Sequence, residues 1–570
     1  MKKYIKSNCF ISISISTLFL LICLIFIHPF YDQADDYYMA LGLSNGDKIL
    51  FINYFLGVFV SFLQGIFENI NVFSIIQIII SFLLMIISNN IFLSRYKKAI
   101  SLPIVFLFDT IIAANHFCKI GFTQLSSLCV CIGTIVIMHG IIYNRRIYVV
   151  SGITIMVVGS FFRFDNIFVG FLFLFFGLFI YYIIYSFILK KRITFKRLVA
   201  KDFMIRVYLP IILLILLVFG FENLSKHIYN TDSSFRQYSI QNNIRSSVED
   251  YPILNYEDNK KIYSNIGLSE NDYKMILSWK IDGAFDNSSL EKLANESKSL
   301  RPNMIHAVSN FIITSFREMI NLSDVGVLIL LLIFTIIIYL VFFKLRYAIF
   351  PLFISIAIGI LNSYLFYIQR YPYRITYGIW LSAIFILIYL FKFCEMNRLG
   401  SIIKFFLYNS KLKILPLVFS ISLCAFYSLT YYFNFNQFFV VSDNSKLFEY
   451  IDNSKKNFVI IGENYDIRNS SETYKNPLTI ANDIYLKKCV SWGMVYYNTP
   501  FYKDQLERFG ISNLYWDLID NKDILLIDNI NSDSVNMMVK YFNEHGTSRI
   551  TYSLVNQIDR FGIFEITTDK

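Results

Sequence analysis

Charged residues are scarce in this chain: Asp, Glu, Lys and Arg make up 16% of its 570 residues, whereas apolar types make up 55%. This composition excludes an ordinary soluble globular protein. Cys and His residues at zinc-binding spacings, a glycine-rich phosphate loop and internal repeats are also absent. Seven of the eight cysteines lie in or beside apolar runs and only Cys489 lies in a large polar segment, which excludes a disulfide framework.

Long apolar runs dominate the chain instead. A helix needs about 20 apolar residues to cross a bilayer, and eleven runs approach that length. We therefore predict a mainly α-helical, polytopic membrane protein with about 11 transmembrane helices. The first run is expected to remain as a span, because no small-residue cleavage site precedes Pro29. The predicted spans are 10–29, 72–92, 99–117, 123–143, 147–162, 166–189, 203–221, 323–343, 347–367, 375–393 and 414–433.

The stretch 49–67 is also apolar, and a crossing there would reverse the orientation of every later span. Without that crossing, 22 Lys and Arg residues fall on the cytoplasmic side and five in the short outer loops. This excess favours a cytoplasmic N-terminus and an amphipathic surface helix over 49–67. The polar stripe of this helix is expected to face water or a substrate. The alternative is that 49–67 forms a twelfth span, with the stripe packed against another helix. The stripe consists of Asn53, Gly57, Ser61, Gln64 and Glu68.

Four regions follow from this topology. They are an N-terminal membrane module over 1–221 whose first outer loop is 30–71, an outer helical loop over 222–322, a second membrane module over 323–433 and an outer α/β domain over 434–570. The net charge of +11 does not predict a nucleic-acid partner, because the last region carries 14 Lys and Arg against 18 Asp and Glu. The positive excess lies between the apolar runs, where it reports orientation. Strands are predicted at 458–461, 524–527, 550–554 and 562–566, and helices at 270–280, 288–299 and 532–545.

Three acidic residues, Asp32, Asp35 and Asp36, follow the first span directly. A helical turn would place Asp32 on the same face as the other two, where like charges repel. Carboxylates in this position can act as a general base, hold a divalent cation such as Mg²⁺ or Mn²⁺, or meet a cationic substrate. The alternative is a solvated loop without chemistry.

Basic residues are rare at the expected outer ends of the spans, and Arg163, Arg370 and Arg374 are among the few. Arg370 and Arg374 are interleaved with tyrosines. This pair is a candidate clamp for a lipid-linked phosphate, because the guanidinium fork binds phosphate in a bidentate manner. An ion pair between Arg163 and Asp165 and an interfacial belt of Tyr and Arg are the alternatives. Two minor candidates for the same basin lie at another outer span end: His116 and Lys119.

The single first span, the outer loop that begins with Ala34–Ala40 (ADDYYMA) and the apolar helix Phe51 to Phe67 resemble the front end of the GT-C superfamily. This superfamily consists of integral membrane glycosyltransferases. The resemblance covers roughly residues 1–200 and the order of the spans. It is to bacterial members associated with cell-surface polysaccharide or glycolipid assembly, whose chains also end in an outer soluble domain.

The resemblance implies an inverting enzyme of the bacterial plasma membrane, in contact with membrane lipids. Such an enzyme moves a sugar from a polyprenyl-phosphate donor to a surface glycan or lipid acceptor on the outer face. In that family an acidic residue of the first outer loop is the general base, and Asp36 or Asp35 matches it. Arginines there hold the donor phosphate, and Arg163, Arg370 and Arg374 match them by location. Some relatives need a divalent metal and others do not.

Two other functional classes remain open. A polysaccharide polymerase or ligase would also use a lipid-linked glycan, and its arginines would matter more than Asp35 and Asp36. A non-enzymatic glycan transporter or an assembly scaffold is the other. The predicted spans are nearly free of charge at their centres, which counts against ion-coupled transport.

Overall fold

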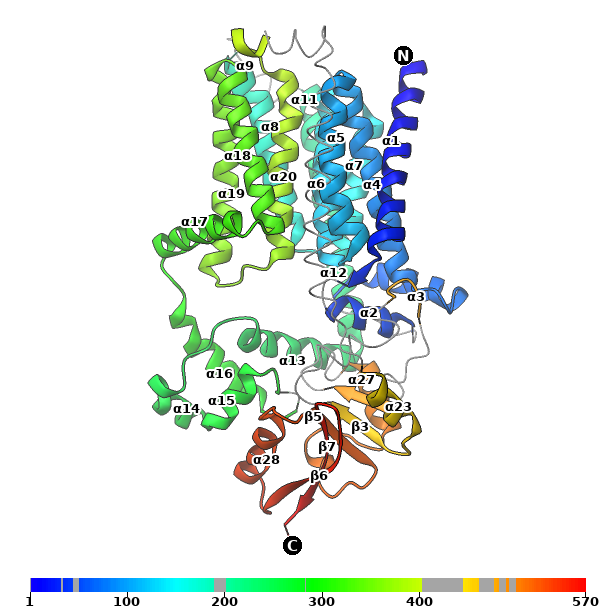
Figure 1. Ribbon diagram of the computed structural model, residues 1–570. Helices are drawn as coiled ribbons and strands as arrows, with labels where there is room; N and C mark the ends of the chain where they lie inside the picture. The colour runs from blue at the N-terminus through cyan, green and yellow to red at the C-terminus, as the bar shows by residue number, and fades with distance from the viewer. Residues whose placement is uncertain are drawn as a thin grey trace.

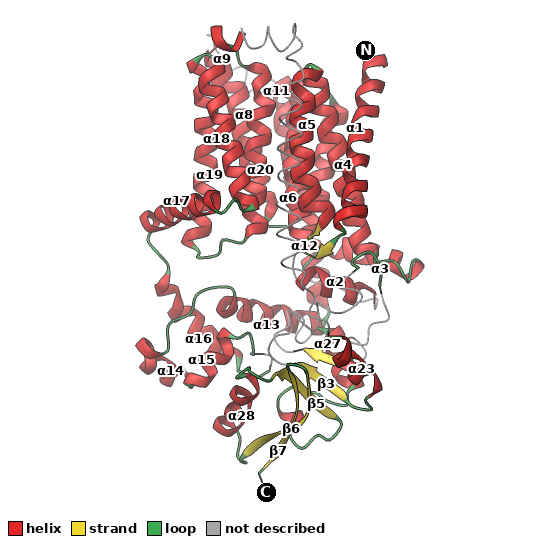
Figure 2. Cartoon of the chain, viewed as in Figure 1, coloured by secondary structure: helices red, strands yellow, loops and turns green. Residues whose placement is uncertain are grey.

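A bundle of long apolar helices forms one part of the molecule, and the polar segments lie together at one end of it (Figure 1, Figure 2). The computed structural model describes residues 2–31, 34–44, 51–188, 201–281, 283–401, 444–460, 476–480, 488–491 and 499–569. Within these residues, nine helices are long and apolar enough to cross a membrane. The elements of the bundle are α1 (Lys2–Ile22), η1 (Cys23–Ile27), α4 (Val72–Arg95), α5 (Lys98–Ala113), η2 (Ala114–Cys118), α6 (Phe122–Tyr143), α7 (Arg146–Phe162), α8 (Asn166–Phe179), η3 (Ile180–Ile184), α9 (Tyr185–Ile188), α11 (Lys201–Phe203), η4 (Met204–Tyr208), α12 (Leu209–Thr231), α18 (Asp324–Phe342), α19 (Ile349–Tyr367) and α20 (Tyr373–Leu390).

The nine helices coincide with nine of the eleven predicted spans. The predicted span 147–162 corresponds to α7, an apolar helix of 17 residues, which is short for a bilayer crossing. The predicted span 414–433 lies outside the described residues. The chain is therefore a multi-pass membrane protein. Its described residues contain nine candidate spans, against the eleven predicted for the whole chain.

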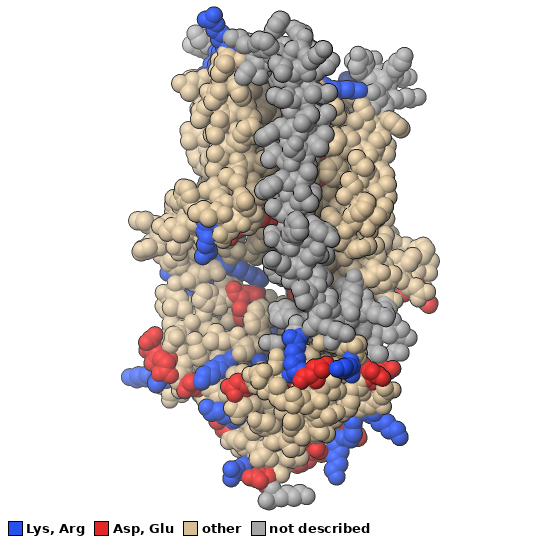
Figure 3. Space-filling view, viewed as in Figure 1, with Lys and Arg blue, Asp and Glu red and all other residues tan. Residues whose placement is uncertain are grey.

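The centre of the bundle is α6, which is buried over almost its whole length. It packs closely against α7, where a Cβ atom on Gly140 would lie 2.6 Å from the Val149 side chain and one on Gly152 would lie 2.6 Å from Ile137. Small residues at such contacts allow membrane helices to approach closely. On the face of the molecule in Figure 3, the described Lys and Arg side chains lie at the two ends of the bundle and on the polar segments beyond it. This distribution agrees with a hydrocarbon environment around the bundle.

The stretch predicted as a surface helix forms α3 (Tyr54–Ile66), whose 13 residues extend about 20 Å and are too short to cross a bilayer. Figure 1 shows α3 lying across the direction of the spans. The expected outward direction of its polar stripe is wrong for three of the five residues, because Asn53, Gly57 and Gln64 are buried against the protein. Ser61 is half-buried, and Glu68, which follows the end of the helix, is exposed. Gln64 binds the following turn through hydrogen bonds to the carbonyl oxygens of Phe67 and Ile70. Apolar side chains are exposed instead.

The segment between the two membrane modules is helical, and it reaches from the bundle to the C-terminal domain (Figure 1). The predicted helices at 270–280 and 288–299 are present, whereas two longer helices in this segment had no counterpart in the prediction. The helices are α13 (Ser233–Glu249), η5 (Glu257–Asn259), α14 (Lys260–Ile266), α15 (Glu270–Leu277), α16 (Asn287–Ser297), η6 (Lys298–Leu300) and α17 (Met304–Ile320).

The C-terminal domain contains a five-stranded mixed sheet in the order β4-β3-β5-β7-β6, which confirms a sheet in this region. Strands β4, β3 and β5 are parallel, and β6 and β7 form an antiparallel hairpin next to β5. The buried run Ile524–Asn529 forms the central strand, as expected for a strand covered on both faces. The elements are α23 (Ser445–Asn453), β3 (Asn457–Ile460), β4 (Cys489–Ser491), α27 (Pro500–Arg508), β5 (Ile524–Asn529), α28 (Ser534–His545), β6 (Ile550–Ile558) and β7 (Phe561–Thr568).

Candidate functional site

A short parallel strand pair joins the first predicted outer loop to the start of α6. Strand β1 (Phe30–Tyr31) pairs with β2 (Lys119–Ile120), and α2 (Ala34–Ser44) begins three residues after β1. Asp36 therefore reaches the first turn of α6, where its Oδ1 accepts the backbone N–H of Phe122 at 2.8 Å. Its exposed fraction is 1%, so Asp36 is buried in the protein.

Asp35 points to a different partner. Its Oδ2 lies 3.3 Å from Nη1 of Arg374, which is in the first turn of α20. Both side chains are about one quarter exposed, so this ion pair lies between the protein and solvent. The predicted convergence of an acid and an arginine that are far apart in the sequence is therefore present.

Arg163 and Arg374 flank the same helix. The Ser126 hydroxyl of α6 donates to the carbonyl oxygen of Arg163 at 3.1 Å, and the next hydroxyl, of Ser127, donates to that of Arg374 at 3.3 Å. The Arg163 guanidinium pairs with Asp165 at 3.3 Å, so the local ion pair considered as an alternative is formed.

The electrostatics of Arg163 show that the cluster is shared. Desolvation lowers the pKa of Arg163 from its ordinary value, and the positive charges of Arg374 and Arg370 lower it further. The carboxylates of Asp165 and Asp35 act in the opposite direction. Three arginines and Asp35 thus lie within electrostatic range at one end of the bundle, an arrangement able to bind an anion beside a carboxylate.

The outer wall of this cluster is α13, which the sequence did not predict. Arg370 pairs with Asp250, the residue after α13, at 2.7 Å. Tyr238 of α13 is buried, and Asp35 adds to the effect of burial in raising the pKa of its hydroxyl. The buried residues Phe235 and Tyr238 are three positions apart, and Ile244 and Val248 are four apart, but six positions separate Tyr238 from Ile244. The helix therefore has no single apolar stripe by which the sequence could have identified it.

His116 and Lys119 belong to a neighbouring polar network. The Lys119 ammonium pairs with Asp324, the first residue of α18, and the Tyr373 hydroxyl lies 3.2 Å from the same carboxylate. His116 is buried in η2, and its Nε2 lies 3.1 Å from the hydroxyl of Tyr377. These contacts join η2 and β2 to α18 and α20.

Asp35 and Asp36 are the residues predicted as possible ligands of a divalent cation, and one oxygen of each carboxylate is already engaged. Asp35 Oδ2 faces a guanidinium and Asp36 Oδ1 accepts a backbone N–H. Asp32 lies outside the described residues. Within the described part of the chain, the one group of three side chains close enough to share a metal is elsewhere: Asp272, Glu544 and His545.

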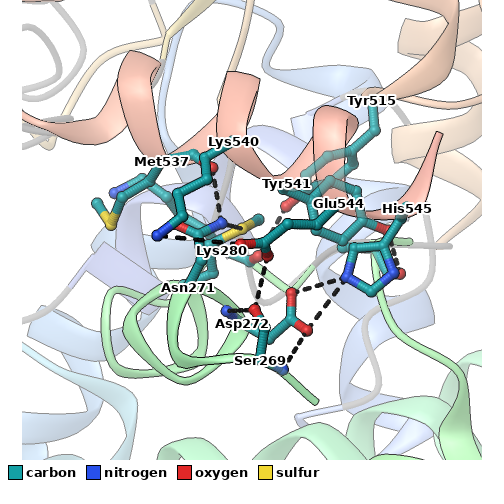
Figure 4. A network of polar contacts seen from close by, with 12 residues as sticks. Ser269, Asn271, Asp272, Lys280, Tyr515, Met537, Lys540, Tyr541, Glu544 and His545 are labelled. Atoms are coloured by element: carbon teal, nitrogen blue, oxygen red, sulfur yellow. Dashed lines mark hydrogen bonds and ion pairs between the residues drawn. The ribbon is translucent and has the colours of Figure 1, made fainter. Parts of the chain in front are cut away.

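That group joins α15 to α28, as Figure 4 shows. Asp272 accepts the backbone N–H of Ser269 at 2.8 Å in a capping box, and the His545 Nε2 lies 3.0 Å from its Oδ1. The Ser269 hydroxyl donates to Glu544 at 2.7 Å. Each side chain already has a protein partner, and the group forms a polar joint between the middle segment and the C-terminal domain.

A carboxyl group also lies inside the bundle. Asp109 is fully buried near the middle of the candidate span Lys98–Cys118, and Asn89 donates to its Oδ2 at 2.7 Å. Among the described residues its Oδ1 has no hydrogen-bond partner. The interpretation that the spans are nearly free of charge at their centres is therefore wrong for α5. Ionisable residues at such positions usually have a functional role.

Comparisons of this chain with protein-family models, with curated proteins and with solved structures find no match.

Proposed function

We propose that this chain is a membrane glycosyltransferase of the GT-C type that uses a polyprenyl-phosphate sugar as donor. The observation that carries the proposal is the Asp35–Arg374 pair, with Arg163 and Arg370 within electrostatic range. A sugar on a lipid phosphate must react at the membrane boundary, and the cluster lies at the end of the candidate spans. The proposal includes a bacterial plasma membrane, a cytoplasmic N-terminus and an acceptor on the outer face.

The structure favours Asp35 over Asp36 as the general base. Asp36 is buried and one of its oxygens is engaged at the start of α6, whereas Asp35 is partly exposed beside an arginine. In the proposed reaction, an acceptor hydroxyl attacks the anomeric carbon from the face opposite the phosphate. The bond between that carbon and the phosphate oxygen breaks, and its electron pair stays on the polyprenyl phosphate. Asp35 takes the hydroxyl proton.

In this proposal, donor binding also breaks the ion pair between Asp35 and Arg374. When the donor phosphate binds Arg374, it competes with Asp35 for the guanidinium. The carboxylate is then released next to the sugar that the acceptor attacks. Arg163 and Arg370 stabilise the negative charge that develops on the leaving phosphate. Donor binding therefore frees Asp35 to act as the base, and this sequence of steps does not use Asp36 as a metal ligand.

The test is sugar transfer by the full-length protein in proteoliposomes, with a panel of polyprenyl-phosphate hexoses and pentoses and a membrane-lipid acceptor fraction. Asp35→Asn and Arg374→Gln are expected to lower transfer at least 100-fold, the size of general acid–base and electrostatic terms. Matched controls are Asp258→Asn and Arg508→Gln, which change exposed residues of the polar segments. Normal transfer by folded, inserted Asp35→Asn would contradict the proposed base, and normal transfer by Arg374→Gln would contradict the proposed clamp.

A glycan transporter is the second candidate, because of Asp109. A buried carboxyl in a span is the feature expected of a transporter that couples movement to ions or protons. Asp109→Asn keeps an acceptor for Asn89 but removes the ionisable group. In vesicles that contain a fluorescent polyprenyl-linked glycan, a transporter would lose movement across the bilayer with this variant. An enzyme would retain transfer with it and show no movement in either form.

A further inference from the structure

Helix α17 has three distinct faces. Its inward face packs on α18, α19 and α20, with the Phe311 ring centroid 6.2 Å from that of Trp380. A second face is polar and exposed, and includes His306, Asn310 and Arg317. The third face is apolar and exposed, and its residues recur at steps of three and four: Ile305, Val308, Ile312, Phe316 and Ile320. A helix that lies beside a bundle at the surface of a bilayer contacts these three environments: protein, water and lipid.

The chain fixes α17 at the end of a span. Only Asn321, Leu322 and Ser323 separate it from α18, and the Ser323 hydroxyl accepts the N–H of Gly326 at 3.0 Å. A Cβ atom on Gly326 would lie 2.0 Å from the carbonyl oxygen of Glu318, so the two helices touch at this corner. Figure 1 shows α17 lying across the direction of α18.

The same construction occurs a second time. Helix α3 precedes the span α4, and the Gln64 side chain locks the corner because its Oε1 accepts the N–H of Val72 at 3.1 Å. Both helices lie near the same end of the bundle, on opposite sides of it (Figure 1). Helix α3 also exposes apolar side chains at helical spacing: Val58, Phe59, Phe62 and Ile66.

We propose that α3 and α17 are interfacial helices whose exposed apolar faces are inserted into one leaflet of the bilayer. The occupant of these faces is lipid, because each helix is joined within a few residues to the end of a candidate span and its apolar face continues the lipid-facing surface. Such helices lie roughly 5–10 Å deep, at the boundary between headgroups and acyl chains. Helix α17 also sets the depth of the cluster of arginines, because Gln369, the residue before Arg370, donates to the carbonyl oxygen of Leu300, four residues before α17 begins.

The experiment places the full-length protein in phosphatidylcholine nanodiscs that carry a diazirine on the acyl chain near the ester, and maps the labelled residues by mass spectrometry. The compared residues have similar exposed fractions: Phe316 of α17 is 59% exposed, Phe334 of the span α18 is 53% exposed, and Val555 of the C-terminal sheet is 49% exposed. We expect labelling of Phe316 and Phe62 at least tenfold above that of Val555 and within about threefold of Phe334.

Labelling of Phe316 and Phe62 at the level of Val555 would overturn the proposal. If a second copy or another protein covered these faces, labelling would also stay at that low level, and this outcome likewise contradicts lipid insertion. A second measurement uses Ile312→Asp, which places a charge on the apolar face, and Asn310→Asp, which places the same charge on the polar face. We expect the first variant to lower labelling of Phe316 at least fivefold and the second to leave it unchanged. Equal labelling in both variants would contradict the assigned faces.

Discussion

The buried carboxylate of Asp36 predicts a measurable structural role. Helix α6 begins after Gly121, whose N-cap position offers no side chain to accept the first N–H groups. Asp36 supplies that acceptor from a distant segment, at 2.8 Å from the Phe122 nitrogen. Replacement of an N-cap acceptor by Ala costs about 0.5–2 kcal/mol, and a buried hydrogen bond to a charged group contributes about 1.5–3 kcal/mol. Because Asp36 is buried and its loss would leave the Phe122 N–H without this acceptor, we expect Asp36→Ala to cost about 2–3 kcal/mol, at the upper end of these ranges.

Hydrogen exchange at the start of α6 measures this cost directly. Because 1.36 kcal/mol corresponds to a factor of ten, a loss of 2–3 kcal/mol makes exchange of the Phe122 amide about 30- to 160-fold faster. Asp36→Asn retains an acceptor and loses the charge, so its effect should be intermediate. The control is Asp35→Ala, which removes a partly exposed ion pair worth about 0–1 kcal/mol and should change exchange by less than about fivefold.

The prediction has a clear refutation. If Asp36→Ala leaves exchange at the start of α6 unchanged in the inserted protein, Asp36 does not cap the helix, and the reason for preferring Asp35 as the base is lost. If both Ala variants accelerate exchange equally, the two acids contribute to one network instead of two separate contacts.

Two further predictions concern joints outside the cluster. Gly326→Ala is expected to abolish correct insertion or folding, because the new methyl group would meet the Glu318 carbonyl oxygen. Gly359→Ala, whose methyl group meets no atom within 4 Å, should be neutral or stabilising by up to about 1 kcal/mol. Monodispersity and the thermal midpoint in detergent compare the two variants, and equal behaviour would contradict the tight corner. His545→Ala is expected to increase exchange in both α15 and α28, because it removes the contact of α28 with Asp272, and an increase confined to α28 would show that the joint does not couple them.

Much of the fold was predictable because its signals are local. A span is a continuous apolar run, so nine predicted spans have counterparts among the candidate spans of the structure. The strands of the C-terminal domain are short apolar runs between turn residues, and the predicted run 524–527 is the buried core of β5. A surface helix was also predicted where α3 lies, but the sequence did not indicate which face of this helix packs against the protein. The periodicity of a stripe shows that residues share a face, and does not show whether that face meets protein or water.

The site was predictable only in part, for a related reason. Arg163, Arg370 and Arg374 share one end of the bundle because alternating spans return their loops to that end. The partners of these residues depend on tertiary packing, and nothing local indicates that Asp250 would meet Arg370 or that Asp324 would meet Lys119. Asp109 was visible in the sequence as a charge within a predicted span, and its significance was missed.

The adjacency of Asp35 and Asp36 invites a reading as one crowded acidic pair, and the geometry of α2 contradicts it. Consecutive residues of a helix point about 100° apart, so one carboxylate enters the protein while the next faces the arginines. The two acids therefore cannot replace each other. We expect Asp35→Asn alone to reduce sugar transfer as far as the double Asn variant does. A double variant that falls at least tenfold below Asp35→Asn, with insertion unchanged, would show instead that Asp36 supplies residual base activity and that both acids act at one centre.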